Sequence, residues 1–550
     1  MVGRSPADDE KASVRTLVFS HLAGIVLAPV VDALWDRKVF DLFNGPSPSV
    51  TLDQIVEHSH GNRGYLHVAL RLLACFNWIR EGTSDQRSYE LTPEGRLAVS
   101  VAPPLYDEVV SFAPKAIFLE DFLFGSSDEP VLPSLRALVF RARSRWGLGG
   151  HVDPVTARVH DQIRNHLDGM LVGPAMVALA RGGVLSQLEL GPVSIPSIAA
   201  NRGSLTCIFD LLAMQGWIAR EQDHVQLTTC GHYAAQIATS YGVTVSYLPM
   251  FNVLHTLMFG NPRTPRLDDS GVELMVNRGM NVWGSGGAHK TYFKKVDEIV
   301  VEIFNRPLSQ QPQGICDMGC GDGSFLEHLY STVRDHTARG AVLDKHPLML
   351  VGADFNKVAR RVAKQMLKKA GIPTFHVISG DINRPAQLAG DLEELGLDIH
   401  DLLHVRSFLD HNRPYIPPAK YVSGARAARS SGAFAHFGRD IPADELEENL
   451  VRHLRRWAPY VGRFGLLVLE LHTLPPPVTA ANLEKTPAVA YDGTHGFSDQ
   501  YLVELPIFLE CVREAGLQAD PRFQCKFPPS ELATVSINFF TTGASPAASH

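Results

Sequence analysis

The stretch Ile315–Phe325, ICDMGCGDGSF, decides the fold of this chain. It begins with strand-forming apolar residues, continues with Gly319, Gly321 and Gly323 at alternate positions, and ends in a helix-compatible run. Glycine has no Cβ, so a tight turn built from these residues brings backbone N–H groups close to a ligand. A turn of this kind between a strand and a helix forms a nucleotide-type site at the carboxyl end of a parallel sheet.

The chain after Gly314 alternates strand and helix signals, as a doubly wound parallel sheet does. In order, the predicted strands are GICDM, LMLVGADF, TFHVISGDI, IHDLLHVRSFL, GLLVLELH, RFQCKF and TVSINFF, the last two at an antiparallel end. We therefore predict an α/β, Rossmann-like, seven-stranded sheet within a domain of residues 301–543, preceded by a mainly helical N-terminal region.

The spacing D-x-G-x-G-x-G of residues 317–323 resembles motif I of the class I S-adenosylmethionine (SAM) methyltransferases. A carboxylate at the end of the second strand can accept both ribose hydroxyls, which makes Asp354 the ribose candidate. Asp381, after the third strand, is placed to accept the adenine amine. Asp317 is placed to order the glycine loop or to bind the methionine amino group. These three carboxylates and the three glycines form the predicted SAM site.

An internal repeat occupies the N-terminal half of the chain. LLACFNWIRE at 72–81 is matched by LLAMQGWIAR at 211–220, and YELTPEG at 89–95 by VQLTTCG at 225–231. Each copy combines an amphipathic helix with a short strand pair, which is typical of a winged helix. We predict winged-helix modules at 1–100 and 166–240, joined by a helical connector or lid at 101–165.

A winged helix binds DNA through a recognition helix that carries Arg, Lys, Asn or Gln. The first copy offers His67 and Arg71 on that helix, and the second offers Ser204, Thr206 and Asp210. The formal net charge is −7, whereas nucleic-acid binding requires a basic face. We therefore predict that the modules are packing scaffolds and that the protein binds no nucleic acid.

Residues 241–300 are predicted to form a lid or linker. Their segment Trp283–His289, WGSGGAH, is too rich in glycine to stay regular for long, so we predict a loop there. A loop just before the first strand of the sheet can close over the cofactor. Trp283 and Gly284 are therefore predicted cofactor-binding residues.

The composition, 45% hydrophobic and 20% charged residues, is that of a soluble globular protein. We find no apolar run that looks long enough to span a bilayer, and the N-terminus MVGRSPADDEK is not signal-like. Seven cysteines are scattered without a C-x-x-C pair, which fits reduced thiols. These features predict a cytoplasmic protein without a membrane partner, and they leave an oligomer open.

Polar side chains gather after the fourth and fifth predicted strands. The candidates are Asp410, His411 and Arg413 after strand four, His472 after strand five, and Asp492, His495, Asp499 and Gln500 further on. Two imidazoles with a carboxylate or amide oxygen are the ligand set of a mononuclear Fe(II) or Mn(II) site. In the alternative interpretation, His411 is a metal-free general base and His472 is a packing residue.

Four motifs suggest a family. NVWGSGGAH, DMGCGDGSF, SFLDHNRPY and HGFSDQYLVE together resemble the metal-dependent C-methyltransferases of polyketide synthase loading modules, of the apratoxin and saxitoxin type, over residues 240–540. The resemblance implies methylation of the α-carbon of a malonyl unit on an acyl carrier protein. It makes His411 and His472 metal ligands, with Gln500 as the third ligand ahead of His495 and Asp499.

This chemistry is coherent, because a divalent metal chelated by the malonyl oxygens stabilises the enolate as a Lewis acid. Arg413 is then a candidate to pair with the substrate carboxylate, and Tyr415 or a metal-bound hydroxide to take the proton. The chain shows no carrier signature, so a free small molecule such as an α-keto acid is an alternative substrate. A metal-free O-methyltransferase and a SAM-sensing regulator complete the alternatives.

Overall fold

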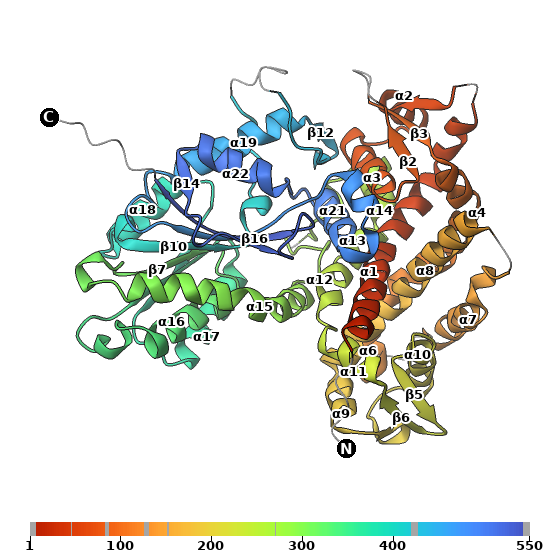
Figure 1. The fold of residues 1–550 in the computed structure, drawn as a ribbon, viewed down its shortest axis with the longest axis horizontal. Helices are drawn as coiled ribbons and strands as arrows, with labels where there is room; N and C mark the ends of the chain where they lie inside the picture. The colour runs from red at the N-terminus through yellow and green to blue at the C-terminus, as the bar shows by residue number, and fades with distance from the viewer. Residues whose placement is uncertain are drawn as a thin grey trace. The chain divides into compact units, whose positions relative to one another are not determined.

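The computed structural model describes residues 7–45, 47–82, 87–125, 131–150, 153–269, 271–419 and 427–542 (Figure 1). The chain forms two compact units. Unit 1 comprises Met1–His289, Ala433–Asp440 and Pro475–Asp499, and unit 2 comprises Lys290–Gly432, Ile441–Leu474 and Gln500–His550. Two short segments that follow the first strand of the predicted catalytic domain therefore belong to unit 1.

Unit 2 is built on one large sheet with the strand order β14-β16-β13-β10-β7-β8-β9, and β15 pairs with β16 beside this path. Its strands are β7 (Gly314–Met318), β8 (Met349–Asp354), β9 (Phe375–Ser379), β10 (Leu402–Ser407), β13 (Leu466–Leu471), β14 (Leu517–Ala519), β15 (Cys525–Phe527) and β16 (Val535–Thr542). Strands β7, β8, β9, β10 and β13 are mutually parallel, and β16 is antiparallel to β13. The predicted Rossmann-like sheet is confirmed, but among the described residues it has eight strands rather than the predicted seven.

The edge of this sheet differs from the prediction. The RFQCKF segment contributes only the short strand β15, which pairs with the start of β16. The edge position next to β16 belongs to β14, which the sequence analysis did not identify. A three-residue strand, Leu517–Ala519, is too short to show the alternation of apolar and polar residues that identifies strands.

Helices cover both faces of the sheet, with α16 and α17 on one face and α19 and α22 on the other (Figure 1). The helices of unit 2 include α16 (Ser324–His336), α17 (Lys357–Lys369), α18 (Pro385–Glu394), α19 (Ala443–Trp457), α22 (Leu505–Glu514) and most of α15 (Arg278–Phe304). All five residues of β7 are buried, because a central parallel strand is covered on both faces.

Unit 1 contains two similar modules, and the predicted repeat is confirmed. The first comprises α1 (Asp8–Asp36), β1 (Ser49–Thr51), α2 (Leu52–Ser59), α3 (Arg63–Cys75), β2 (Ile79–Glu81) and β3 (Ser88–Leu91). The second comprises α8 (Pro154–Arg181), α9 (Val184–Leu190), β4 (Val193–Ser194), α10 (Arg202–Met214), β5 (Ile218–Glu221) and β6 (His224–Leu227). The sheet orders correspond, β1-β3-β2 and β4-β6-β5.

The segment between the modules is helical. It contains α4 (Pro93–Val110), α5 (Ala113–Ala116), α6 (Leu119–Phe124) and α7 (Val131–Arg143). The second module is followed by α11 (Thr229–Gln236), α12 (Ser240–Ser246), α13 (Leu248–Asn252) and α14 (Leu254–Phe259), and the later segments of unit 1 add β11 (Phe434–His436), α20 (Pro476–Ala480) and α21 (Ala488–Phe497).

The two modules repeat the same close approach between a tryptophan and a glycine. A Cβ placed on Gly95 would lie 1.7 Å from the Trp78 carbonyl oxygen, and one on Gly231 would lie 1.8 Å from that of Trp217. Both tryptophans are buried. Only glycine fits at these positions, so the final glycine of the LTPEG and LTTCG motifs meets the same packing requirement in both copies.

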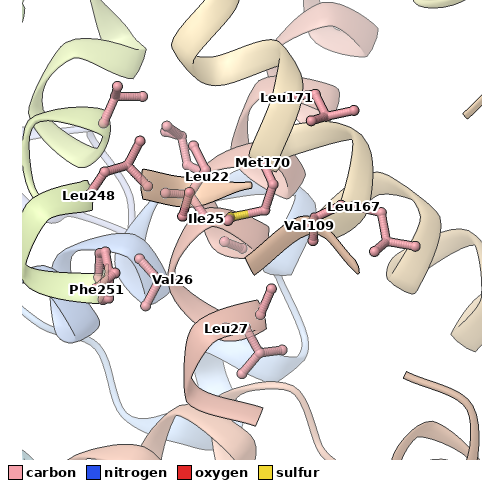
Figure 2. Close-up of a cluster of buried hydrophobic side chains, with 14 of the residues drawn as sticks. Leu22, Ile25, Val26, Leu27, Val109, Leu167, Met170, Leu171, Leu248 and Phe251 are labelled. Atoms are coloured by element: carbon pink, nitrogen blue, oxygen red, sulfur yellow. The ribbon is translucent and has the colours of Figure 1, made fainter. Parts of the chain in front are cut away.

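The long helices α1 and α8 cross at a matched pair of motifs, HLAG at 21–24 and HLDG at 166–169. A Cβ on Gly24 would lie 2.2 Å from the His166 Cα, and one on Gly169 would lie 2.5 Å from the His21 Cα. Figure 2 shows the apolar side chains around this region, including Leu22 and Ile25 of α1 and Met170 of α8.

The same crossing carries two reciprocal hydrogen bonds. His21 of the first module bonds through Nδ1 to the Tyr241 hydroxyl at 2.7 Å, and Tyr241 follows the second module. His166 of the second module bonds through Nδ1 to the Tyr106 hydroxyl at 2.6 Å, and Tyr106 follows the first module. The two copies therefore exchange equivalent contacts, as two halves related by an approximate twofold axis do.

The glycine-rich segment is not the predicted loop. Residues 283–289 lie inside helix α15. A Cβ on Gly284 would lie 2.5 Å from the Val243 backbone nitrogen, and one on Gly287 would lie 2.1 Å from the Thr239 hydroxyl oxygen. The glycines therefore allow α15 to pack closely on α12 and the turn before it, and this packing overrides their low helix propensity.

The expectation that no apolar run could span a bilayer was wrong for α1. An 18-residue window of this helix has a mean hydropathy of 2.0, and 78% of that window is buried in the protein. The bent pair Pro154–Arg181 and Val184–Leu190 passes the same test of length and composition. Burial of this kind is expected for the core helix of a folded domain.

Candidate active site

The glycine loop after β7 adopts the conformation that its sequence requires. Gly319, Gly321 and Gly323 have φ angles of 82°, 53° and 84°, in the left-handed region that other residues rarely adopt. The Gly319 N–H donates to the Ala353 carbonyl at 2.7 Å, and the Gly321 N–H donates to Asp354 Oδ2 at 3.0 Å. The loop is therefore held against the end of β8.

The predicted ribose residue, Asp354, joins the loop to the strand end. Besides Gly321, its carboxylate accepts the Asn356 N–H at 2.7 Å on Oδ1. The predicted adenine residue, Asp381, lies beyond the end of β9 and accepts the Asn383 N–H at 2.8 Å. The structure places both carboxylates at the carboxyl ends of adjacent strands, and their contacts with a cofactor stay a prediction.

A pocket of about 260 Å³ lies between these strand ends. It is lined by Phe355, Ser379, Gly380, Asp381, Arg384, Gln387, Leu388 and Asp391. Phe355 is 84% exposed, which is unusual for a large aromatic side chain. An aromatic face beside a carboxylate suits a flat, hydrogen-bonding ring such as adenine.

The carboxyl of Asp317, at the end of β7, is 1% exposed. Among the described residues, its Oδ1 has no hydrogen-bond partner. Burial, together with the negative charges of Asp354 and Asp322, raises the pKa of this carboxyl well above its usual range. A buried acceptor that lacks a donor is expected to receive one from a bound group, so the site fits a ligand that carries N–H donors and positive charge.

His411 is oriented by a carboxylate that the sequence analysis did not identify. The imidazole Nδ1 is hydrogen-bonded to Oε1 of Glu470, and the His411 backbone N–H donates to Oε2 at 3.1 Å. Glu470 also accepts the Leu471 N–H at 2.7 Å and is buried in β13. The signal in the sequence was an acid between leucines in the strand LLVLEL, where a buried charge needs a partner.

The turn that carries His411 is held in place by the hydrogen bonds of the preceding residue, Asp410. Asp410 Oδ1 accepts hydrogen bonds from Arg406 Nη1 at 2.7 Å and from His453 Nε2 at 2.8 Å. Burial alone would raise the pKa of Asp410, but the charge of Arg406 and the bond to His453 hold it below its usual range. Just before this turn, Phe408 has a φ of 55°, which redirects the chain out of β10.

The predicted substrate residues Arg413 and Tyr415 are both buried. Arg413 donates from Nε to Asn449 Oδ1 and from Nη1 to the Asp410 carbonyl, each at 2.8 Å. The Tyr415 hydroxyl donates to Glu445 of α19. Both side chains therefore hold the loop after β10, and their roles toward substrate or proton stay predictions.

The predicted metal ligand His472 uses both ring nitrogens within the protein. Its Nδ1–H donates to the Val503 carbonyl at 3.2 Å, and Nε2 accepts the Ser536 hydroxyl at 2.7 Å. The side chain is 0% exposed, and burial lowers its pKa to about 3. An imidazole with both nitrogens engaged in this way does not fit a metal ligand, which must offer a lone pair to the ion.

Two of the three candidates for a third ligand belong to unit 1, whereas Gln500 belongs to unit 2 with His411 and His472. The carboxylate of Asp499 is in unit 1, where it accepts from the Tyr65 hydroxyl at 2.7 Å and the Phe437 N–H at 3.0 Å. His495 is also in unit 1. Gln500 precedes Tyr501, whose N–H donates to the His411 carbonyl at 2.8 Å.

In the part of the chain that the structure describes, no group of three His, Cys, Asp or Glu side chains is arranged to hold a metal ion. Asp492, which the sequence analysis placed near the same site, pairs with Arg71 inside unit 1. The predicted cofactor residues Trp283 and Gly284 pack against α12, also within unit 1. The predicted iron or manganese site therefore does not fit the arrangement of these side chains.

Three family models match the chain, and all describe AprA domains. The AprA N-terminal domain matches residues 14–81, the AprA winged helix domain matches 168–261, and the AprA MT2-like domain matches 273–538. No curated protein is significantly similar to the sequence.

The chain is also similar to several solved structures. The mitomycin 7-O-methyltransferase MmcR is 15% identical, with 70% of this chain and 98% of that chain covered and a TM-score of 0.40. Human N-acetylserotonin methyltransferase, in complex with SAM, is 14% identical over 72% and 99% of the two chains, with a TM-score of 0.39. PigF with SAH is 13% identical over 69% and 98%, with a TM-score of 0.37.

The three AprA models together account for most of residues 14–538, and they agree with the helical modules of unit 1 and with the sheet and glycine loop of unit 2. The chain therefore belongs to the AprA-type SAM-dependent methyltransferases of class I fold.

Proposed function

We propose that this methyltransferase methylates the α-carbon of a malonyl-type acyl unit carried as a thioester, with His411 as the general base. The observation that carries the proposal is the buried pair of His411 and Glu470. The match to an AprA MT2-like domain and the motif resemblance to polyketide C-methyltransferases support carbon as the acceptor. Delivery of the acyl unit by an acyl carrier protein is part of the proposal.

The pair defines which nitrogen of His411 acts. Glu470 lies at Nδ1, so the imidazole carries its proton there and its lone pair is on Nε2. When Nε2 takes a proton, the carboxylate of Glu470 stabilises the resulting imidazolium. The arrangement supplies a base of fixed orientation, which general base catalysis requires.

The α-carbon of a malonyl thioester lies between two carbonyl groups, so its proton is acidic enough for an imidazole base. His411 Nε2 takes this proton, and the electron pair of the broken C–H bond becomes the nucleophile. Bound SAM supplies an electrophilic methyl group on a sulfonium. A C–C bond forms as the methyl–sulfur bond breaks, and holding the two carbons in line is the main task of the protein.

The sequence analysis included an Fe(II) or Mn(II) centre in this reaction. Because both nitrogens of His472 are engaged by Val503 and Ser536, we route no step through a metal. The enolate charge would instead be balanced by the imidazolium of His411.

O-methylation of a hydroxyl group is the second candidate. The same pair of His411 and Glu470 can take a proton from an alcohol or phenol, so O-methylation would need no other base. An α-keto acid, whose β-carbon is also acidic, is a related acceptor. NMR of the product separates C-methylation from O-methylation, because a methyl group on carbon and one on oxygen have different chemical shifts.

The deciding experiment is intact-mass analysis of a malonyl-loaded carrier protein incubated with enzyme and SAM. One sample contains EDTA and a second contains Fe(II) or Mn(II). We expect one added methyl group in both samples and none with the His411→Ala variant. Methylation only in the presence of metal would overturn the metal-free mechanism. Turnover of a hydroxylated compound or a keto acid, without methylation of the carrier, would favour the alternatives.

A further inference from the structure

The carboxyl of Asp317 is not explained by the catalytic pair. It is almost fully buried at the end of β7, in register with Gly352 of β8 and Val405 of β10. Within the described residues, its Oδ1 has no hydrogen-bond partner, and no cation is among the groups that shift its pKa. A buried carboxylate in such surroundings is costly, because it has lost water without gaining a donor.

The charges around Asp317 increase this cost. Carboxylates lie near it on the glycine loop and at the end of β8, and thiols that burial keeps neutral lie on β7 and on the loop. These groups are Asp322, Asp354, Cys316 and Cys320. On β10 the nearest charged residue is Arg406, whose guanidinium is bound to Asp410 and lies over the Trp457 ring at 4.1 Å.

We propose that Asp317 is protonated in the cofactor-free enzyme and releases this proton to solvent when the cationic cofactor binds. The protonated acid avoids a buried charge beside Asp322 and Asp354. A bound ammonium or sulfonium group reverses that preference, because it supplies the positive charge that the described residues do not. One O–H bond breaks, the proton goes to the buffer, and the carboxylate remains paired with the cofactor.

This coupling makes the affinity for SAM depend on pH. Burial and the neighbouring carboxylates raise the pKa of Asp317 in the free protein, and a bound cation lowers it. The cofactor therefore binds best when the proton is already lost. As the pH falls below the raised pKa, the dissociation constant for SAM should rise by up to about tenfold for each pH unit.

Isothermal titration calorimetry of the full-length protein tests the proposal without any turnover. SAM is titrated at several pH values from about 5.5 to about 7, below the pKa of an ordinary α-amino group. Each pH is measured in two buffers with different ionisation enthalpies, since the difference in measured heat gives the protons released. We expect up to one proton released per SAM bound, with the fraction decreasing as the pH rises.

Ligands that lack one cationic group separate the two possible sources of charge. S-adenosylhomocysteine keeps the ammonium and lacks the sulfonium, and adenosine lacks both. We expect adenosine to bind without proton release. Release with S-adenosylhomocysteine would assign the coupling to the ammonium, and its absence would assign the coupling to the sulfonium.

Two matched variants complete the test. Asp317→Asn keeps the size of the side chain and should abolish proton release while weakening SAM binding. Asp354→Asn removes another carboxylate of the same site and should weaken binding, while proton release persists but shifts to lower pH, because one of the charges that raise the pKa of Asp317 is gone. If wild-type protein releases no proton with SAM at any pH, or if Asp317→Asn releases as much as wild type, the proposal is wrong. The wild-type comparison of SAM with adenosine decides the question even if a variant does not fold.

Discussion

At the scale of single residues, Glu470 determines what His411 can do. The carboxylate bonds both the imidazole Nδ1 and the backbone N–H of His411, so it fixes the ring and its proton at once. Neither residue needs to move between the resting protein and the proposed reaction. Preorganisation of this kind is where most of the rate enhancement by a base is expected to arise.

Glu470→Gln should lower kcat by about 10²-fold or more while leaving SAM affinity within a few-fold of wild type. The amide keeps the volume of the side chain but cannot balance the charge of a protonated imidazole. Steady-state kinetics with the methyl acceptor and calorimetric titration of SAM provide the two readouts. Partial recovery of kcat in Glu470→Asp, without a change in SAM affinity, would distinguish positioning of His411 from a general loss of structure. An unchanged kcat in Glu470→Gln would contradict the role.

His472 is expected to act on stability rather than on chemistry. His472→Ala removes two buried hydrogen bonds and leaves the Ser536 hydroxyl and Val503 carbonyl to find new partners. The free energy of unfolding should fall by about 3 kcal/mol, from lost hydrogen bonds and a small cavity. Urea denaturation measures this change, and kcat per folded molecule should stay within a few-fold of wild type. Loss of kcat together with loss of bound iron or manganese, at unchanged stability, would instead restore the metal hypothesis.

At the scale of elements, α15 shows how packing overrides local preference. Four residues of WGSGGAH have weak or no intrinsic tendency to form a helix, yet the helix continues through them. Gly284 and Gly287 meet other parts of unit 1 at distances that leave no room for a Cβ, whereas a Cβ on Gly286 would meet nothing within 4 Å. The two kinds of glycine provide a matched comparison on one helix.

Gly284→Ala should destabilise the protein by about 1–3 kcal/mol, because the new methyl group collides with the backbone of Val243. Gly286→Ala should stabilise it by about 0.5–1 kcal/mol, because alanine loses less entropy in an exposed helical position. Both changes are measured as shifts in the midpoint of urea unfolding. Equal effects of the two substitutions would mean that the segment is not a packed helix.

The sequence predicted those elements whose signal is local. Strands β7, β8, β10 and β13 are rich in apolar residues, as buried parallel strands are, and each was identified close to its observed bounds. Glu470 was missed because the role of an acid in an apolar strand depends on its partner, and this partner lies 59 residues earlier in the chain. The membership of His495 and Asp499 in unit 1 was missed for the same reason, since strand and helix periodicity carry no information on which core a segment joins.

At the scale of the whole molecule, unit 1 consists of two similar modules that pack against each other. The glycines of HLAG and HLDG bring α1 and α8 together, and each histidine is bonded by a tyrosine that follows the opposite module. The contacts that hold the halves together are therefore long-range, and each half contributes the same chemistry. A change at one histidine should consequently resemble a change at the other.

Because His21 and His166 are buried, they should make the free energy of unfolding depend on pH. Burial lowers the pKa of His21 to about 3, and burial followed by the charge of His21 lowers that of His166 to about 3. The unfolded chain binds protons below about pH 6.5, whereas the folded protein resists them until about pH 3. Stability is therefore full above pH 6.5 and is lost as the pH falls, by roughly 2 kcal/mol for each histidine between pH 6.5 and pH 5.

Urea unfolding of the full-length protein from pH 7.5 to pH 5 measures this loss. His21→Gln and His166→Gln should each cost stability at pH 7.5, because a buried hydrogen bond to tyrosine is disturbed. Each variant should also flatten the decline toward pH 5 by a similar amount, since the group that the unfolded chain protonates is gone. His404, His453 and His472 are buried with lowered pKa values as well, so part of the slope should survive in the double variant. An unaltered slope in both single variants would show that the two imidazoles are not held neutral at the crossing of α1 and α8.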